Sequence, residues 1–329
     1  MKRYLFFVLV ILNGVVFSQN KDKARQQIMS MLERNNPDAY YMLTSLYKMP
    51  TKFKSGNVTI SSSPPSDFMV YSQRYKAKEI LSDISTVVHE TCHMYQSQKP
   101  NVLLIERGIP LDFDTDYSVY YIGKTEEYLV KHTPTFPSVK MAGDIPSDLQ
   151  SFRYDTYIKT NQSVLGTQQS GVYGLMDEWS AYYNGFKTTV LNFDEYPKSE
   201  GNMDGYFNFL SDAGSIHMAY PEFKYYILQY LEYASRMEKS IYDQIMTNED
   251  FKTAFVAIDN AYSSIIEIYN LKKLDIEKTA KTKGLDYRES DDYIMIGNKG
   301  VGSFKQEYSG YEKAINQQNF KVIIETLSQ

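Results

Sequence analysis

Hydrophobic residues recur with a helical period along most of this chain. Between residues 76 and 98 they occupy positions 80, 81, 84, 87, 88, 94 and 95, which share one side of a helical wheel, with polar residues on the other. The break at Asn36-Pro37 separates two further helices, because proline favours a helix start and disfavours helical geometry in the preceding residue. The pattern predicts helices over 20–34, 38–48, 76–98, 146–160, 172–192, 204–218, 221–246, 249–278 and 303–328.

Alternating residues predict a few short strands between these helices. Residues 52–72 look extended, and short runs at Val102 to Ile105 and Tyr117 to Ile122 lie between Gly and Pro residues. The whole pattern predicts a mainly α protein with a small β-sheet (α+β) and a helical C-terminal half. We expect one compact domain over 19–329, in which any division into two lobes would fall near 196–204.

The first residues have the pattern of a secretory signal peptide. Lys2 and Arg3 precede an apolar run from Tyr4 to Phe17, and the chain turns polar from Ser18. The run is shorter than the roughly 20 residues that cross a bilayer as a helix. We expect cleavage after Ser18 and an exported protein, secreted or periplasmic, without stable membrane insertion. An uncleaved membrane anchor is the alternative.

Composition and charge narrow the classes of partner. Removal of residues 1–18 moves the formal net charge from −5 to −7, so the sequence predicts no nucleic-acid binding. The single cysteine, Cys92, excludes an internal disulfide, so stability must come from the core, with a bound metal as an open further source. Most of the 30 tyrosines are expected to pack, with their hydroxyls bonded to a partner or to water.

The polar face of the 76–98 helix carries the motif H-E-x-x-H at His89, Glu90 and His93. Histidines at i and i+4 lie one turn apart on one face, where both imidazoles can bind one tetrahedral ion at roughly 2.0 to 2.1 Å. Glu90 lies about 100° round the helix, so it can reach the metal's water without being a ligand. We expect Zn²⁺ on His89 and His93, Glu90 as general base, and Cys92 as a buried thiol.

A catalytic zinc usually keeps three protein ligands and a water. Gln96 and Lys99 stand where the metzincin extension requires Gly and His, so that class is excluded. Neither His132 nor His217 stands near an acid on an obvious helix face, which favours a carboxylate as the third ligand. Glu178 is the best candidate. Weaker candidates on loop-like segments are Glu126, Glu127 and Asp144.

A stripe of small residues lies beside Glu178 in its predicted helix. Gly174, Ala181 and Gly185 fall on one side of the helical wheel, and small residues let two helices approach closely, as a shared metal requires. Asp177 lies about 100° away, either behind the site or facing solvent. The alternative is that Glu178 is a surface or capping acid.

The segment Leu175 to Tyr183 resembles the second-ligand helix of the aminopeptidase N-type gluzincins, the zinc peptidases that include the thermolysin type. In that helix a small residue follows the ligand glutamate by three and an aromatic residue follows it by five, as Ala181 and Tyr183 follow Glu178. The resemblance implies a zincin-like fold and a His89, His93 and Glu178 zinc site. Residues 94–177, 84 in all, separate the two motifs, which is far more than in familiar members.

These features predict an exported zinc-dependent peptidase that acts on peptides or proteins. Glu90 would take a proton from the zinc-activated water and pass it to the leaving amine. The resemblance implies a Tyr or His that binds the oxyanion, for which His217, Tyr220 and Tyr182 are candidates. His217 could instead be a buried or capping residue. Two alternatives stay open: a zinc-containing binding or structural protein without turnover, and a metal-dependent hydrolase of non-peptide amides or esters.

The predicted strand at Tyr117 to Ile122 is the main strand signal between the two motifs. We expect it to lie near the metal. Its exposed edge is then expected to hold an extended substrate by backbone hydrogen bonds.

Overall fold

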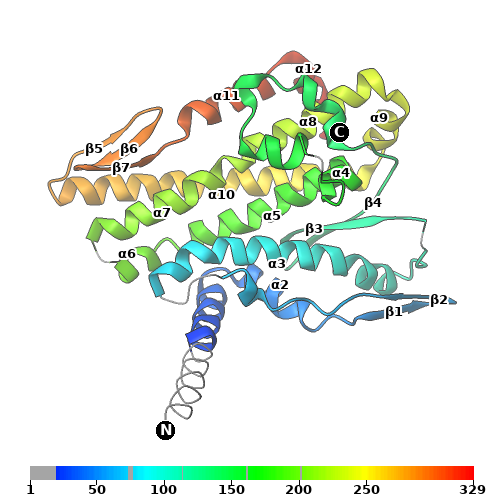
Figure 1. The fold of residues 1–329 in the computed structure, drawn as a ribbon, viewed down its shortest axis with the longest axis horizontal. Helices are drawn as coiled ribbons and strands as arrows, with labels where there is room; N and C mark the ends of the chain where they lie inside the picture. The colour runs from blue at the N-terminus through cyan, green and yellow to red at the C-terminus, as the bar shows by residue number, and fades with distance from the viewer. Residues whose placement is uncertain (1–19, 73–76, 113, 161, 201) are drawn as a thin grey trace, which may run out of the picture.

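A computed structural model describes residues 20–72, 77–112, 114–160, 162–200 and 202–329, and the predicted signal peptide lies outside the described residues. Within these ranges the chain is mainly helical with small antiparallel sheets, as predicted (Figure 1). After a helix at 20–35, the helices are α2 (Pro37–Leu46), α3 (Ala77–Glu106), α4 (Gly166–Gln169), α5 (Val172–Leu191), α6 (Glu195–Glu200), α7 (Asn202–His217), α8 (Ala219–Met237), α9 (Lys239–Met246), α10 (Glu249–Thr282), α11 (Lys305–Ile315) and α12 (Gln318–Leu327).

Three separate antiparallel sheets accompany these helices. The strands are β1 (Lys52–Ser55) with β2 (Val58–Ser61), β3 (Tyr117–Gly123) with β4 (Glu126–Lys131), and β5 (Tyr287–Glu289) with β6 (Tyr293–Ile296) and β7 (Lys299–Gly302). Short 3-10 helices cover Phe68–Val70, Ser138–Asp144 and Ser147–Leu149, and a π-helical turn covers Tyr154–Ile158.

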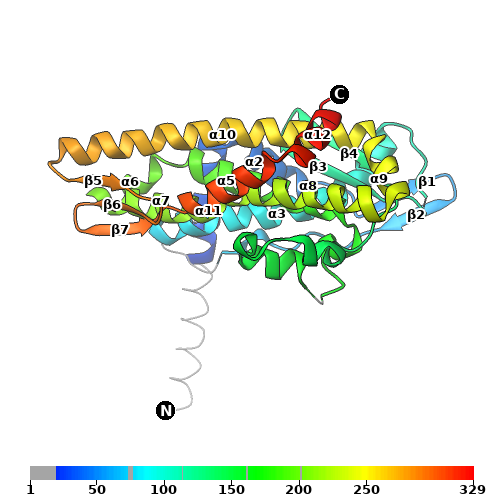
Figure 2. The ribbon, with the colours of Figure 1, turned by 90° about the horizontal axis from the view of Figure 1, so that it is seen from above.

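Helix α5 is the centre of the molecule. It contacts α3, α7, α8 and α10, and residues on all of its sides are buried, among them Leu175, Trp179 and Phe186. Such all-round burial suits a helix that is apolar over most of its surface. Figure 2 shows α10 on one side of the layer that contains α3, α5 and α8, and the segment around Ser138–Asp144 and Gly166–Gln169 on the opposite side. The core therefore surrounds the helix that carries Glu178.

Helix α3 is longer than predicted, because it continues past Pro100 to Glu106. The strand predicted at residues 102–105 is wrong. Proline removes the backbone hydrogen bond to the residue four earlier, which here is Gln96. Leu103 and Leu104, however, enter a second small core with residues of β1 and β3, and this burial outweighs the lost bond.

The strand predicted at Tyr117 to Ile122 is confirmed as β3, but the expectation of an exposed edge is wrong. The backbone N–H of Tyr121 donates to Oε1 of Gln96 at 2.9 Å. The carbonyl of Tyr121 accepts from Ser180 at 3.1 Å and from Asn184 at 2.8 Å. Side chains of α3 and α5 thus occupy both backbone groups of Tyr121, and residues 119–123 of β3 are buried.

Several predicted helices are divided or replaced. Residues 146–160 form short 3-10 and π-helical turns in place of one regular helix. The predicted helix 221–246 breaks at Glu238, and 303–328 breaks between α11 and α12. No strand was predicted where β5, β6 and β7 lie. In the part of the chain that the structure describes, no helix has the length and apolarity to cross a membrane.

Candidate metal centre

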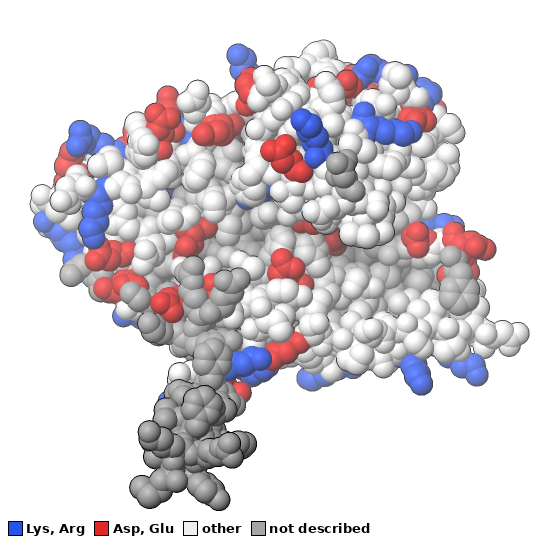
Figure 3. All heavy atoms as spheres, in the orientation of Figure 1, with Lys and Arg blue, Asp and Glu red and all other residues white. Residues whose placement is uncertain are grey.

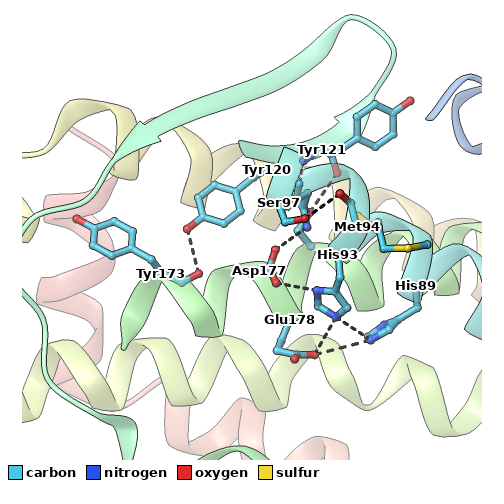
Figure 4. A network of polar contacts seen from close by, with 12 residues as sticks. His89, His93, Met94, Ser97, Tyr120, Tyr121, Tyr173, Asp177 and Glu178 are labelled. Atoms are coloured by element: carbon cyan, nitrogen blue, oxygen red, sulfur yellow. Dashed lines mark hydrogen bonds and ion pairs between the residues drawn. The ribbon is translucent and has the colours of Figure 1, made fainter. Parts of the chain in front are cut away.

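His89, His93 and Glu178 converge on one point between α3 and α5 (Figure 4). Nε2 of His89 lies 3.1 Å from Nε2 of His93. Oε2 of Glu178 lies 3.7 Å from the first of these nitrogens and 3.4 Å from the second. The two helices thus bring together the three side chains that the sequence predicts as metal ligands.

These three separations match the dimensions of a tetrahedral zinc site. Ligand bonds of 2.0 to 2.1 Å at tetrahedral angles place neighbouring donor atoms roughly 3.3 to 3.4 Å apart. Oε2 of Glu178 is buried and has no hydrogen-bond partner among the described residues. Because an unsatisfied buried carboxylate oxygen is costly, its position is explained if it binds a cation. Two imidazoles and one carboxylate are a donor set that zinc accepts.

Each of the two histidines has a further hydrogen-bond partner. Oδ2 of Asp177 lies 2.7 Å from Nδ1 of His93, and His89 bonds to the backbone of Ala181. A proton held at Nδ1 leaves the lone pair of Nε2 free for a metal. The sequence placed Asp177 either behind the site or in solvent, and the structure places it behind His93 (Figure 4).

Gln96 fixes the position of Asp177 in turn. Its Nε2 donates to Oδ1 of Asp177 at 2.8 Å, and its Oε1 accepts from Tyr121 and Ser180. Gln96, which stands where a metzincin would have glycine, therefore holds the candidate ligand His93 in place through Asp177. Gln96 is buried, and this network connects β3 to the metal centre.

The electrostatic field of the site favours a cation. Burial lowers the pKa of His93, but the carboxylates of Asp177 and Glu178 outweigh this and raise that pKa well above its ordinary value. Burial lowers the pKa of His89 well below its usual range, and the neighbouring His93 adds to the effect. The negative charge that would stabilise an imidazolium at His93 also stabilises a divalent ion between the same groups.

Glu90 lines a cavity of about 180 Å³ together with His89. Burial raises the pKa of Glu90, His93 opposes the change, and Glu178 adds to it. Figure 3 shows a hollow across the middle of this face, with Asp and Glu side chains along it. Glu90 thus lines a cavity beside the candidate ligands His89, His93 and Glu178, as general-base chemistry requires.

Two tyrosines line the same cavity. The ring centroid of Tyr182 lies 4.5 Å from that of His89, and its hydroxyl lies 3.2 Å from the hydroxyl of Tyr157. The guanidinium of Arg153 lies over the ring of Tyr182, 4.7 Å from the ring centroid. Arg153 is paired with the buried Glu222 at 3.0 Å, so its charge is balanced within the core.

The structure does not bring His217 or Tyr220 to this cavity. The ring of His217 stacks on Tyr308 at a centroid distance of 4.4 Å. Burial lowers its pKa to about 3, and Lys273 adds to the shift. The hydroxyl of Tyr220 contacts Asp259 and Ser263, both at 2.8 Å. Of the three predicted oxyanion donors, Tyr182 is the one that lines the cavity.

The other predicted alternatives have partners elsewhere. The carboxylate of Glu127 accepts from Tyr95 and lies 3.2 Å from Nζ of Lys99. Asp144 pairs with Arg236, and Glu126 begins β4. His132 stacks on Tyr173, and burial lowers its pKa to about 4. None of these side chains belongs to the group of His89, His93 and Glu178.

Sequence reasoning missed Tyr157 and Arg153. Tyr157 lies in the π-helical turn Tyr154–Ile158, where the sequence predicts a regular helix. π-Helical turns are rare and are often found at functional sites. No sequence signal separates Tyr157 from the other tyrosines, because its position depends on contacts between segments far apart in the chain.

Comparison with protein families, with curated proteins and with solved structures gives no match to this chain. The resemblance to gluzincins therefore rests on the two short motifs around His89 and Glu178. What the site can do must be derived from its own geometry.

Proposed function

We propose that this chain is a zinc-dependent peptidase in which His89, His93 and Glu178 bind the metal and Glu90 is the general base. One observation carries the proposal. Three donor atoms from two helices lie at the separations of tetrahedral zinc ligands, with two imidazole nitrogens 3.1 Å apart. The glutamate between the histidines lines the adjoining cleft.

Zinc bound to these residues would lower the pKa of a water to about 7 and polarise a carbonyl group. Glu90 accepts the proton of the attacking water and transfers it to the leaving amine. Such general acid–base transfer typically contributes ~10² to 10⁴ in rate. Asp177 keeps the proton of His93 at Nδ1, so that the orientation of the ring does not change during turnover.

The hydroxyls of Tyr157 and Tyr182 supply the donor for the oxygen that becomes negative during attack. Both residues line the cavity, and their hydroxyls lie 3.2 Å apart. A hydrogen bond that strengthens as this charge develops is worth most in a site that excludes water. We take Tyr157 as the preferred donor, because burial and then the carboxylate of Glu178 raise the pKa of its hydroxyl, so that this group keeps its proton close to a candidate ligand.

We also propose that the protein is exported, with residues 1–18 as a signal peptide. The support is the sequence pattern of two basic residues, an apolar run and a polar stretch. Sequencing of the N-terminus of the protein recovered from the producing cells tests this directly. A chain that still begins at Met1 would contradict it.

Metal analysis and a digest of an unbiased peptide library test the function. The purified protein is expected to hold one zinc per chain and to cut peptides, and a chelator is expected to abolish cleavage until zinc is returned. A zinc-containing protein that cleaves no peptide would contradict the proposal. Cleavage of ester or amide substrates without cleavage of peptides would favour the hydrolase alternative.

A further inference from the structure

A second cavity, of about 370 Å³, lies between the segment 148–153 and residues of α7, α8 and α11. Among the described residues, it shares none of its lining with the cavity beside His89. Arg153 lines this second cavity, and its guanidinium lies over the ring of Tyr182, which lines the other. The two cavities are therefore separate spaces, and a ligand in the second does not touch the candidate metal ligands.

Apolar and aromatic side chains form most of the walls of this second cavity. Leu149, Met218 and Tyr311 are buried, whereas Phe152 is 64% exposed and so lies at the open edge. Sites for small molecules typically have volumes of about 300 to 1,000 Å³ and walls that are mainly apolar, with a few polar groups. The size and the lining of this cavity thus suit a small organic molecule, which would cover the exposed ring of Phe152.

Phe304 adds a further aromatic wall and has an unusual backbone conformation. Its φ is 55°, and among the described residues no other non-glycine residue has a positive φ. This region is disfavoured for a residue that has a Cβ atom, and such conformations are often found at ligand sites. The ring of Phe304 lies 3.5 Å from the position that a Cβ at Gly214 on α7 would take. The strained residue thus holds its ring against α7 at the wall of the cavity.

The charged groups that line this cavity are mainly negative. Arg153 is the one cation among the described lining residues, and it pairs with the buried Glu222 at 3.0 Å. Asp148 and Glu307 are exposed, and neither forms an ion pair with another described residue. Three carboxylates and one guanidinium leave a formal net charge of −2. The lining therefore attracts a cation and repels an anion.

We propose that this cavity binds a small organic cation that has an aromatic or branched apolar body. The apolar body packs on Leu149, Met218 and Phe304, and the cationic group lies at the edge with Asp148 and Glu307. Aromatic faces in the same lining add cation–π attraction. The proposal does not depend on the peptidase function, because no residue of the candidate metal group lines this cavity.

Three probes that share one apolar body and differ in charge test the proposal on the purified protein. These are naphthylethylamine, naphthylethanol and naphthylacetate, whose two rings fit the volume, since a cavity of about 150 Å³ holds benzene. Ligand-observed NMR at low salt measures their affinities. The amine is expected to bind about threefold or more tightly than the alcohol, and the acetate most weakly. High salt should remove the advantage of the amine. Equal or tighter binding of the acetate would overturn the proposal.

Substitutions at the exposed edge locate the bound amine. Asp148→Asn combined with Glu307→Gln is expected to lower the affinity for the amine to that for the alcohol and to leave the alcohol unchanged. Either single change should lower the affinity for the amine in part. Glu312→Gln is the matched control, because Glu312 is an exposed glutamate on the same helix, α11, outside the lining.

Phe152→Ala is expected to weaken binding of the amine and the alcohol alike, because it removes an apolar wall. Tyr293→Ala is its control, since Tyr293 is a 57% exposed aromatic residue on β6. If the folded charge variants and Phe152→Ala all bind the amine as wild type does, the amine binds elsewhere and the proposal is overturned. Absence of amine binding to wild type would overturn it as well, whether or not the protein cuts peptides.

Discussion

At the scale of single residues, the site depends on side chains that hold other side chains. His93 has Asp177 behind it, and Asp177 has Gln96. Outer partners of this kind orient a ligand before a metal arrives, and their loss typically costs about 10- to 100-fold in metal affinity or activity. Glu178 differs, because its buried Oε2 has no such partner among the described residues.

Glu178→Ala is predicted to weaken zinc binding more than Asp177→Asn does. The first change removes a ligand atom, whereas the second removes an orienting partner and should cost roughly 10- to 100-fold. Competition with a calibrated chelator measures both affinities. Glu249→Ala is the control, because the Glu249 side chain is 73% exposed on α10. Equal zinc affinity in Glu178→Ala and wild type would assign the third ligand elsewhere.

Tyr157→Phe is predicted to lower kcat by about 10² to 10³ with little change in KM. The hydroxyl is needed when charge develops on the substrate oxygen and contributes little before that. Tyr154→Phe serves as control, since Tyr154 lies in the same turn and its hydroxyl donates to the carbonyl of Ala142. If Tyr182→Phe alone reduces kcat, the donor is Tyr182.

The sequence indicated the three candidate ligands that the structure brings together, but not Tyr157 beside them. His89, Glu90 and His93 share one helix, so their relative positions follow from helical geometry alone. Glu178 was predicted because neither remaining histidine suited the role of third ligand, and the small residues near it added the expectation of a close helix pair. Tyr157 gave no signal, because a π-helical turn and contacts to α5 and α8 place it.

At the scale of elements, the contact between α3 and α5 builds the site. The small-residue stripe predicted this contact, and Gly185 confirms it at Ser85. Gly174 differs, because a Cβ there would meet the backbone of Gly166 in α4 at 2.2 Å. The small residues therefore allow α5 to pack closely against both α3 and α4. The helical wheel could not assign each small residue to one of these two contacts.

Gly185→Ala is predicted to lower both the zinc affinity and the melting temperature. In an open helix, alanine would be more favourable than glycine by about 1 kcal/mol. Here its Cβ would lie 3.0 Å from the carbonyl oxygen of Ser85, so α3 must move from α5 beside His89. Gly143→Ala is the control, because an added Cβ meets nothing within 4 Å there. An unchanged zinc affinity would show that the helix spacing is adaptable.

Errors in the predicted elements arise where tertiary contacts outweigh local preference. The predicted helix 76–98 ends too early, because burial of Leu103 and Leu104 sustains α3 beyond Pro100. The segment 146–160 has helical periodicity but forms separate turns. Arg153 directly precedes the turn Tyr154–Ile158, and its charge pairs with Glu222 on α8 and anchors the segment there.

At the scale of the whole molecule, a helical body surrounds α5 (Figure 1). Its surface has a hollow on the face shown in Figure 3, and a cavity lies beside the candidate ligand His89. The mainly α architecture with small sheets followed from the hydrophobic periodicity. The sequence predicted the contact between distant helices only for α3 and α5, where small residues and candidate metal ligands required it. His217 belongs to this body, because its ring packs on Tyr308 and Tyr269.

His217→Phe is predicted to leave peptide hydrolysis within a few-fold of wild type and to make stability less dependent on acid. The histidine titrates near 6.5 when unfolded and at about 3 when folded. Below pH 6.5 the unfolded chain therefore binds the extra proton, and wild-type stability falls by up to about 1.4 kcal/mol per pH unit from this group. Urea unfolding of both proteins between pH 7 and pH 4, at one zinc concentration, measures the difference. Loss of hydrolysis in a folded variant would restore His217 as a catalytic candidate.

The most direct test of the central claim compares Glu90→Gln with wild type at equal zinc occupancy. Glutamine keeps the size of the side chain but cannot accept a proton from water, and Glu90 is not a metal ligand in this geometry. Zinc content and melting temperature should stay close to wild type, while peptide hydrolysis should fall by at least about a hundredfold. Comparable cleavage by the two proteins would contradict the proposed mechanism.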